Sequence, residues 1–201
     1  MRPKAVVFDL GKVLLDFDYR LAARKFAAQS RLTPEQLLGH FDYSPVLLRY
    51  ERGQMTRVEF FNLVRAATGF SGDLAQFGEF FGDIFTPIEP MIALHAEVRG
   101  RGLPTYVFSN TNELAIEHIR RRFPFFGTFV GYILSYELGA MKPDREMYEA
   151  VERQTGCAGA EIAYLDDRPE NVVAGVARGW QAMLHESPEQ TRLRFREMGL
   201  V

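Results

Sequence analysis

The chain contains 201 residues, of which 47% are hydrophobic, and its formal net charge is −2 at pH 7. This apolar content argues against a disordered chain and suffices for one domain, or for a core domain with a small insertion. The near-neutral charge gives no electrostatic reason to expect nucleic acid or a membrane surface as a partner. Cys157 is the only cysteine, so a disulfide within the chain is excluded and a reducing compartment is favoured.

The apolar residues near the N-terminus are interrupted by Asp9 and Lys12. A signal peptide or a transmembrane segment needs a longer uninterrupted apolar run, so we expect neither. We therefore expect a cytoplasmic protein that is a monomer or a weak dimer.

The first part of the chain is expected to be helical after a single strand. Apolar residues predict a buried strand at 4–9, and a periodic apolar face predicts a helix at 19–30. Favoured N-cap residues indicate three further helix starts: Thr33, Thr56 and Asp73. Residues 16–86 are therefore predicted to be helical, with no convincing strand.

After Pro87 the pattern changes to alternating helices and strands. Helices are predicted at 90–101, 112–122, 143–154 and 169–178, and strands at 104–109, 128–134, 161–165 and 180–184. A last helix at 187–199 would cover the core. Such alternation is typical of a parallel sheet with right-handed crossovers. The predicted fold class is α/β, a parallel-sheet core with a helical insert after the first strand.

Asp9 stands where the first apolar strand ends, and Gly11 follows two residues later. Sheets of this class hold their active sites at the carboxyl edge. A carboxylate at that position can act as a nucleophile and form a covalent intermediate that water then hydrolyses. The alternative interpretation is a carboxylate that only caps a loop or a helix.

Ser109 and Asn110 follow the predicted strand at 104–109, and Lys142 precedes Pro143 at a helix start. A hydroxyl and backbone N–H groups ahead of a helix suit a phosphate oxygen. A lysine can neutralise phosphate and keep a nearby carboxylate ionised. Alternatively, Ser109 and Asn110 are helix caps and Lys142 is an ordinary solvated lysine.

Asp166 and Asp167 are adjacent carboxylates directly after a predicted buried strand. They repel each other, and a hard divalent cation such as Mg²⁺ would relieve that repulsion. Asn171 could tie the same loop together or orient a metal-bound water. The alternative for the acid pair is N-capping of the helix at 169–178. The four histidines lack metal-ligand spacing, so zinc is not supported.

The ordered motifs together resemble those of the haloacid dehalogenase-like hydrolase superfamily. Asp9 matches the first motif of that superfamily, Ser109 the second, Lys142 the third, and Asp166 with Asp167 the fourth. Within the superfamily, the chain is most similar to bacterial phosphatases that include an α-glucose-1-phosphate phosphatase. Further segments support this similarity: Phe8–Gly11, Tyr50–Gly53 and Ser109–Asn112.

The resemblance implies a Rossmann-like catalytic core formed by residues 1–15 and 87–201, and a helical cap formed by residues 16–86. It also implies a Mg²⁺-dependent phosphatase that hydrolyses a small phosphorylated metabolite, such as a sugar phosphate, through an aspartyl-phosphate. The implied catalytic residues are Asp9, Ser109 and Lys142. The implied metal ligands are Asp9, the Gly11 carbonyl, Asp166 and Asp167. The expected substrate-binding residues are Ser109, Asn110, Lys142, Asp16 and Asp18.

Gly11 departs from the usual pattern of that superfamily. Most of its phosphatases have a second aspartate at this position, which acts as acid and base. If nothing replaces it, the rate should depend steeply on the pKa of the leaving group. Three candidates for a replacement acid are Asp16, Asp18 and His40. The cap residues expected to set substrate specificity are Asp16, Phe17, Asp18, Tyr43, Arg49 and Glu51.

Two other functions remain as alternatives to the phosphatase. One is a 2-haloacid dehalogenase, which Gly11 suits because a halide needs no proton, but which has no evident use for the acid pair. The other is a non-catalytic phosphate-binding protein on the same fold.

Overall fold

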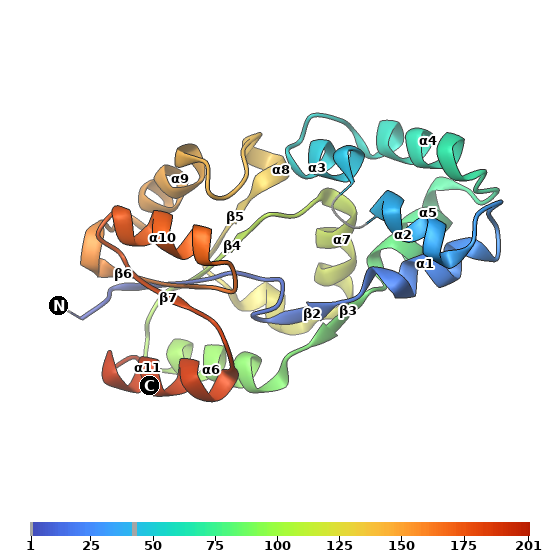
Figure 1. The fold of residues 1–201 in the computed structure, drawn as a ribbon. Helices are drawn as coiled ribbons and strands as arrows, with labels where there is room; N and C mark the ends of the chain where they lie inside the picture. The colour runs from blue at the N-terminus through green and yellow to red at the C-terminus, as the bar shows by residue number, and fades with distance from the viewer. Residues whose placement is uncertain (1, 42–43) are drawn as a thin grey trace.

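The computed structural model describes residues 2–41 and 44–201 (Figure 1). Five parallel strands form the main sheet in this spatial order: β5 (Gly131–Leu134), β4 (Thr105–Ser109), β1 (Ala5–Phe8), β6 (Ile162–Asp166) and β7 (Gln181–Leu184). The sheet is extended from β1 in both directions, with β4 on one side and β6 on the other. In open α/β sheets this switch point is where a crevice forms at the carboxyl ends of the strands.

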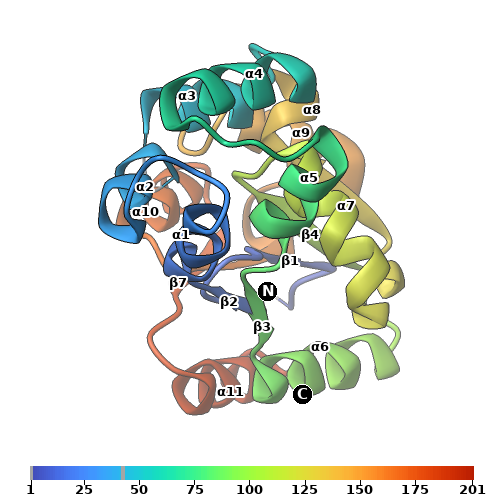
Figure 2. The ribbon, with the colours of Figure 1, turned by 90° about the vertical axis from the view of Figure 1, so that its right-hand side faces the viewer.

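Helices cover both faces of the sheet (Figures 1 and 2). One face carries α6 (Glu89–Gly100), α7 (Glu113–Arg122) and α11 (Pro188–Glu197); the other carries α9 (Arg145–Thr155) and α10 (Pro169–Ala177). Val6 and Phe8 of β1 pack in one apolar cluster with Met91 of α6, whereas Val7 packs with Met147 of α9. Alternate residues of a strand point to opposite faces, so both faces of β1 are buried. The predicted α/β class is confirmed.

In the described part of the chain, five helices form a second part of the molecule beside the sheet (Figure 1). They are α1 (Tyr19–Ala27), α2 (Pro34–Phe41), α3 (Pro45–Glu51), α4 (Arg57–Thr68) and α5 (Leu74–Gly82). Their apolar faces enclose a cluster of phenylalanines that includes Phe26, Phe60 and Phe77. Leu114 of α7 belongs to the same cluster, so these helices rest on α7. The predicted N-caps at Thr56 and Asp73 are both present, and Thr56 forms a capping box with Glu59.

Two short strands join the helical part to the sheet. β2 (Leu15–Phe17) and β3 (Phe85–Pro87) pair antiparallel, with Asp16 opposite Thr86. The expectation of no strand within 16–86 is therefore wrong at both ends of that range. Strands of three residues are too short to show a period-two pattern, and their pairing joins segments remote in sequence.

The remaining described elements are short: α8 (Ser135–Leu138) and the 3₁₀ turns at Pro124–Thr128 and Gly159–Glu161. α8 follows β5 and approaches the end of α3 (Figure 1). Within residues 2–41 and 44–201, no helix combines the length and the apolar character needed to cross a membrane.

Candidate active site

The carboxyl ends of three neighbouring strands bring the predicted residues together. Asp9 follows β1, Ser109 ends β4, and Asp166 ends β6 with Asp167 next to it. β1 lies between β4 and β6, so parallel pairing aligns the ends of all three strands. Asp9, Ser109 and Asp166 are buried, whereas Asp167 is partly exposed.

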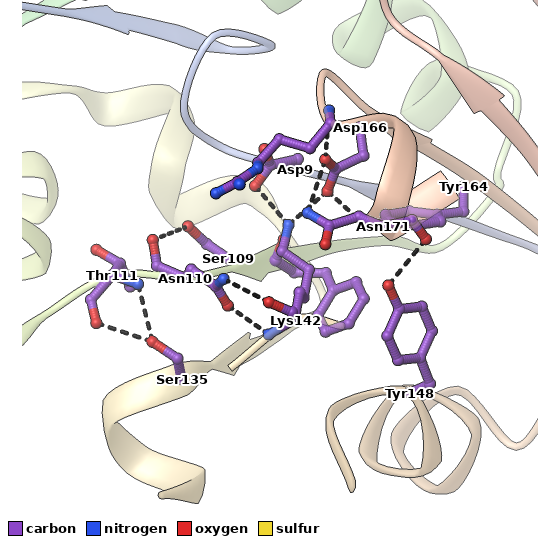
Figure 3. Close-up of polar contacts among 12 residues, drawn as sticks. Asp9, Ser109, Asn110, Thr111, Ser135, Lys142, Tyr148, Tyr164, Asp166 and Asn171 are labelled. Carbon is purple, nitrogen blue, oxygen red and sulfur yellow. Dashed lines mark hydrogen bonds and ion pairs between the residues drawn. The ribbon is translucent and has the colours of Figure 1, made fainter. Parts of the chain in front are cut away.

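The ammonium group of Lys142 lies between two of these carboxylates (Figure 3). Its Nζ donates to Asp9 Oδ1 (2.8 Å), to Asp166 Oδ2 (2.6 Å) and to the Phe108 carbonyl oxygen (2.8 Å). Burial alone would lower the pKa of Lys142, but the carboxylates of Asp166 and Asp9 raise it above its ordinary value. Lys142 is therefore positively charged at neutral pH and orients the Asp9 side chain.

Asn110 holds the backbone at Lys142 rather than pointing its amide freely at a ligand (Figure 3). Its Oδ1 accepts from the Lys142 N–H (2.7 Å), and its Nδ2 donates to the Lys142 carbonyl oxygen (3.0 Å). The next residue, Thr111, donates through its N–H to the Ser135 hydroxyl (2.9 Å). The loop after β4 therefore fixes the position of Lys142, a role that the sequence did not predict for Asn110.

Asp166 is buried among four donors. Its carboxylate accepts hydrogen bonds from Lys142, from the Tyr164 hydroxyl (2.5 Å), from the Arg168 N–H (2.9 Å) and from Asn171 Nδ2 (2.9 Å). Burial acts to raise the pKa of Asp166, yet Lys142 and the other donors hold it below its ordinary value. Asn171 ties this loop together, which is one of the two roles expected for it.

Carboxylate oxygens of Asp9, Asp166 and Asp167 all lie within 4.8 Å of one another. Burial raises the pKa of Asp9, and the charges of Asp166 and Asp167 raise it further, although Lys142 acts in the opposite direction. Burial and the Asp166 charge likewise raise the pKa of Asp167. A hard divalent cation would offset this repulsion, and carboxylate oxygens are the ligands that Mg²⁺ prefers. The donor set therefore fits the expected metal.

A cavity of about 820 Å³ opens above these strand ends. Its core side includes Asp9, Gly11, Ser109, Lys142 and Asp167. Its opposite side is built from the helical part and the loops leading to it: Phe17, Asp18, Tyr19, Arg20, Leu38, Leu47, Leu48, Glu51 and Arg52. A small metabolite fits a cavity of this size, and both parts of the molecule would contact it.

The end of α3 is attached to the core beside this cavity. The Ser135 hydroxyl donates to the Glu51 carbonyl oxygen (2.7 Å), and Arg52 Nη1 donates to Asp144 Oδ2 (2.7 Å). The Tyr50 hydroxyl accepts from the Leu114 N–H (3.3 Å). These contacts hold the helical part against the core on one side of the cavity.

Gly11 lies against an aromatic ring. A Cβ at this position would lie 3.0 Å from Cε1 of Phe17. Gly11 does not have a positive φ, so the Phe17 ring is what restricts a larger residue there. Phe17 therefore occupies space beside the position where most members of the resembled superfamily have their second aspartate.

The other candidates for binding and acid catalysis are differently placed. Asp18 lines the cavity, but it pairs with Arg20 and caps α1; these hydrogen bonds hold its pKa below the ordinary value. Asp16 pairs with Lys12, which lowers the pKa of Asp16, and neither Asp16 nor His40 is among the described residues that line the cavity. Both aspartates are therefore ionised at neutral pH and are poor proton donors.

Of the residues expected to set specificity, Phe17, Asp18 and Glu51 line the cavity and Arg49 is exposed outside its lining. Tyr43 lies outside the described residues.

Four cations of the cavity wall were not predicted from the sequence. These are Lys12, Arg20, Arg52 and Arg168. Lys12 directly follows Gly11 and has a positive φ (59°); among the residues that the structure describes, it is the only one other than glycine that does. Arginine and lysine are common on any surface, so residue type alone did not distinguish these four. Lys12 and Arg168 lie in the loops after β1 and β6, whereas Arg20 and Arg52 reach the cavity only because the helical part folds over the sheet.

The fold and this site define an enzyme of the Rossmann-like α/β class. The sequence profile of the haloacid dehalogenase-like hydrolases matches residues 3–179, which is most of the chain. The chain therefore belongs to the haloacid dehalogenase-like hydrolase family.

Two characterised relatives align over most of the chain. The sesquiterpene phosphatase astK of Aspergillus oryzae is 28% identical over 178 residues, which are 88% of this chain and 86% of that protein. The D-ribitol-5-phosphate phosphatase of Bacteroides thetaiotaomicron is 20% identical over 190 residues, which are 92% of each chain. A solved structure of a HAD-family enzyme from Bacteroides thetaiotaomicron, a magnesium complex, has a TM-score of 0.82 and 23% identity, covering 98% of this chain and 100% of its own. This last similarity shows a shared fold.

Proposed function

We propose that this protein is a Mg²⁺-dependent phosphatase that hydrolyses a small phosphorylated metabolite through an aspartyl-phosphate. The observation that carries the proposal is the buried Asp9 carboxylate at the β1 end, held by Lys142 and open to a cavity of about 820 Å³. Family membership supports the hydrolase class. The two relatives named as phosphatases support phosphate as the group that is removed.

In this proposal the side chains at the strand ends have distinct tasks. Asp9 attacks phosphorus, and the bond to the leaving oxygen breaks. Lys142 favours the ionised form of Asp9, orients it and offsets negative charge beside the phosphoryl group, while Ser109 lines the same space as a hydrogen-bond donor. Asp9, Asp166, Asp167 and the Gly11 carbonyl would hold Mg²⁺, which supplies positive charge to the phosphoryl oxygens.

We further propose that residues 1–15 and 87–201 act as the catalytic core and residues 16–86 as a cap. Support comes from the separate apolar cluster of the helical part and from its contribution to the cavity wall. A cap in this position excludes bulk water from the acyl phosphate and contacts the leaving group.

The residues of the cavity wall suit two classes of substrate. Its polar groups, including Asp18, Arg20 and Arg52, suit the hydroxyl groups of a sugar phosphate such as glucose 1-phosphate. A second class, a phosphate ester with an apolar body, is favoured by the apolar side chains of the same wall: Phe17, Tyr19, Leu38, Leu47 and Leu48. The relatives are named for a terpene and a polyol phosphate, so both classes belong in the test.

The experiment is a phosphate-release screen in the presence of Mg²⁺. The panel contains glucose 1-phosphate, ribitol 5-phosphate, farnesyl phosphate and 4-nitrophenyl phosphate. Chloride release from 2-chloropropionate is measured in parallel. We expect phosphate release and no chloride release. Chloride release alone would support the dehalogenase alternative, and tight phosphate binding without release of either product would support a binding protein.

A further inference from the structure

Glu51 is a carboxyl group in the cavity that the roles above leave unused. It is the last residue of α3 and lines the same cavity as Asp9, Ser109 and Lys142. We propose that Glu51 is the general acid and base of the proposed phosphatase reaction, and this inference rests on that proposed function. Glu51 would come from the helical part and replace the side chain that Gly11 lacks. Glu51 would touch the leaving oxygen and then the attacking water.

The backbone at Glu51 is held in place by the core. Ser135 of α8 binds the Glu51 carbonyl oxygen at 2.7 Å, and the neighbouring Arg52 pairs with Asp144 at 2.7 Å. An acid that must meet a reacting atom needs this kind of fixed position.

The surroundings of Glu51 favour its protonated form. Burial raises its pKa to about 7, although the hydrogen bond with Asn112 acts in the opposite direction. Its place in the last turn of α3 adds to the effect, because the C-terminal end of a helix carries partial negative charge. A carboxyl group with a pKa close to the working pH can both give and take a proton.

The proton transfers balance over the two steps. In the first step, Asp9 bonds to phosphorus, the bond from phosphorus to the leaving oxygen breaks, and that oxygen takes the Glu51 proton. The product leaves as an alcohol and Glu51 becomes a carboxylate. In the second step, water loses a proton to Glu51 and attacks phosphorus, which releases Asp9 as a carboxylate and yields inorganic phosphate. Glu51 is then protonated again.

Neighbouring carboxyl groups fit this role less well. Asp18 is bound by Arg20, and Asp16 by Lys12. Both pairs favour the carboxylate form, and their pKa values lie below the ordinary value for this reason. Among the described cavity residues outside the carboxylate cluster at the strand ends, Glu51 is the carboxyl group with a raised pKa.

The test compares wild-type protein with Glu51→Gln on two kinds of ester in Mg²⁺. An aryl phosphate such as 4-nitrophenyl phosphate has a leaving group that departs without a proton, whereas the alkyl leaving group of glycerol phosphate needs one. We expect Glu51→Gln to lower kcat/KM for alkyl esters about 100-fold or more, and for aryl esters by roughly threefold at most. This parameter reports the first step and excludes the hydrolysis of the aspartyl-phosphate, which both kinds of ester share. Glu137→Gln, an exposed carboxyl of α8 outside the cavity lining, is the matched control and should leave both rates unchanged.

A second readout needs only the wild-type protein. The ratio of kcat/KM for alkyl esters to kcat/KM for aryl esters should fall as pH rises through about 7, because the proton donor is then lost. Titrations shared by both substrates cancel in this ratio. Other charged groups also face the cavity. Arg52 lies beside Glu51, Lys12 lies in the loop after β1, and Asp18 and Arg20 lie at the start of α1. The rest are Asp9, Lys142, Asp167 and Arg168 around the strand ends.

The outcomes separate this proposal from the function on which it rests. Absence of phosphate release by the wild type overturns the proposed function, and this inference with it. An equal loss of kcat/KM on aryl and alkyl esters in Glu51→Gln, or no loss of kcat/KM on either, overturns the role of Glu51 alone. If the variant does not fold, a rate ratio for the wild type that stays constant from pH 5 to pH 9 overturns it.

Discussion

Lys142 shows how one buried charge links the stability of this fold to its chemistry. The side chain is 2% exposed, and its ammonium group is shared between Asp9 and Asp166. Removing a charge from water is costly, and direct contact with two carboxylates offsets that cost. The contact also fixes the Asp9 oxygen that would attack phosphorus. Loss of the lysine should therefore affect folding and turnover together.

We predict that Lys142→Met destabilises the protein by about 3 kcal/mol at pH 8, because two buried carboxylates lose their counter-charge. The loss should shrink as pH falls, since Asp9 and Asp166 then take up protons. Phosphate release should fall about 100-fold or more. Urea unfolding in chelator at pH 5 and pH 8, with a phosphate assay, measures these effects.

Lys4→Met is the control, because Lys4 forms an exposed pair with Glu161. Its effect should stay below about 1 kcal/mol at both pH values. A Lys142→Met protein as stable as the wild type at pH 8 would contradict the proposed electrostatic role.

At the scale of elements, the turn after α3 positions Glu51, because Gly53 in this turn packs against α8. Gly53 has φ 66°, and a Cβ there would lie 2.2 Å from the Tyr136 carbonyl oxygen of α8. The backbone at Gly53 thus lies so close to the backbone of α8 that a residue with a Cβ would not fit there. The hydrogen bonds of Ser135 and Arg52 are made beside this contact.

Gly53→Ala should push α3 away from α8 and lower kcat/KM for every substrate about tenfold or more, because misplaced groups lose their effect over about 1 Å. Gly156→Ala is the matched control. Gly156 has the same φ of 66°, but no heavy atom lies within 4 Å of its added Cβ. It should cost about 1 kcal/mol in stability from backbone strain and leave kcat/KM unchanged. Equal kinetic effects in the two variants would refute the contact argument.

At the scale of the whole molecule, the cavity is built jointly by the sheet and the helical part. The strand ends supply Asp9 and Ser109, and the loop between α8 and α9 supplies Lys142, while the end of α3 supplies Glu51 and Arg52. The division suits a phosphatase, because the phosphoryl group needs one fixed set of charges and the leaving group needs a separate wall.

Features that depend on neighbouring residues could be predicted from the sequence, whereas contacts between segments far apart in the chain could not. The alternating strands and helices after Pro87 were predicted because each carries its own period, and Asp9 and Asp166 because they end buried strands. The β2–β3 pair and the contact of Asn110 with Lys142 join segments remote in sequence. No local pattern encodes such contacts, so the structure was needed to find them.

The central claim is that Asp9 and Mg²⁺ together release phosphate. The most direct test measures phosphate release from 4-nitrophenyl phosphate by wild-type protein and Asp9→Asn, each with Mg²⁺ and with excess chelator. We predict release only by the wild type with Mg²⁺, and a rate at least about 1,000-fold lower in Asp9→Asn, because an amide is a poor nucleophile. Wild-type rates in metal-free protein, or in Asp9→Asn, would contradict the account.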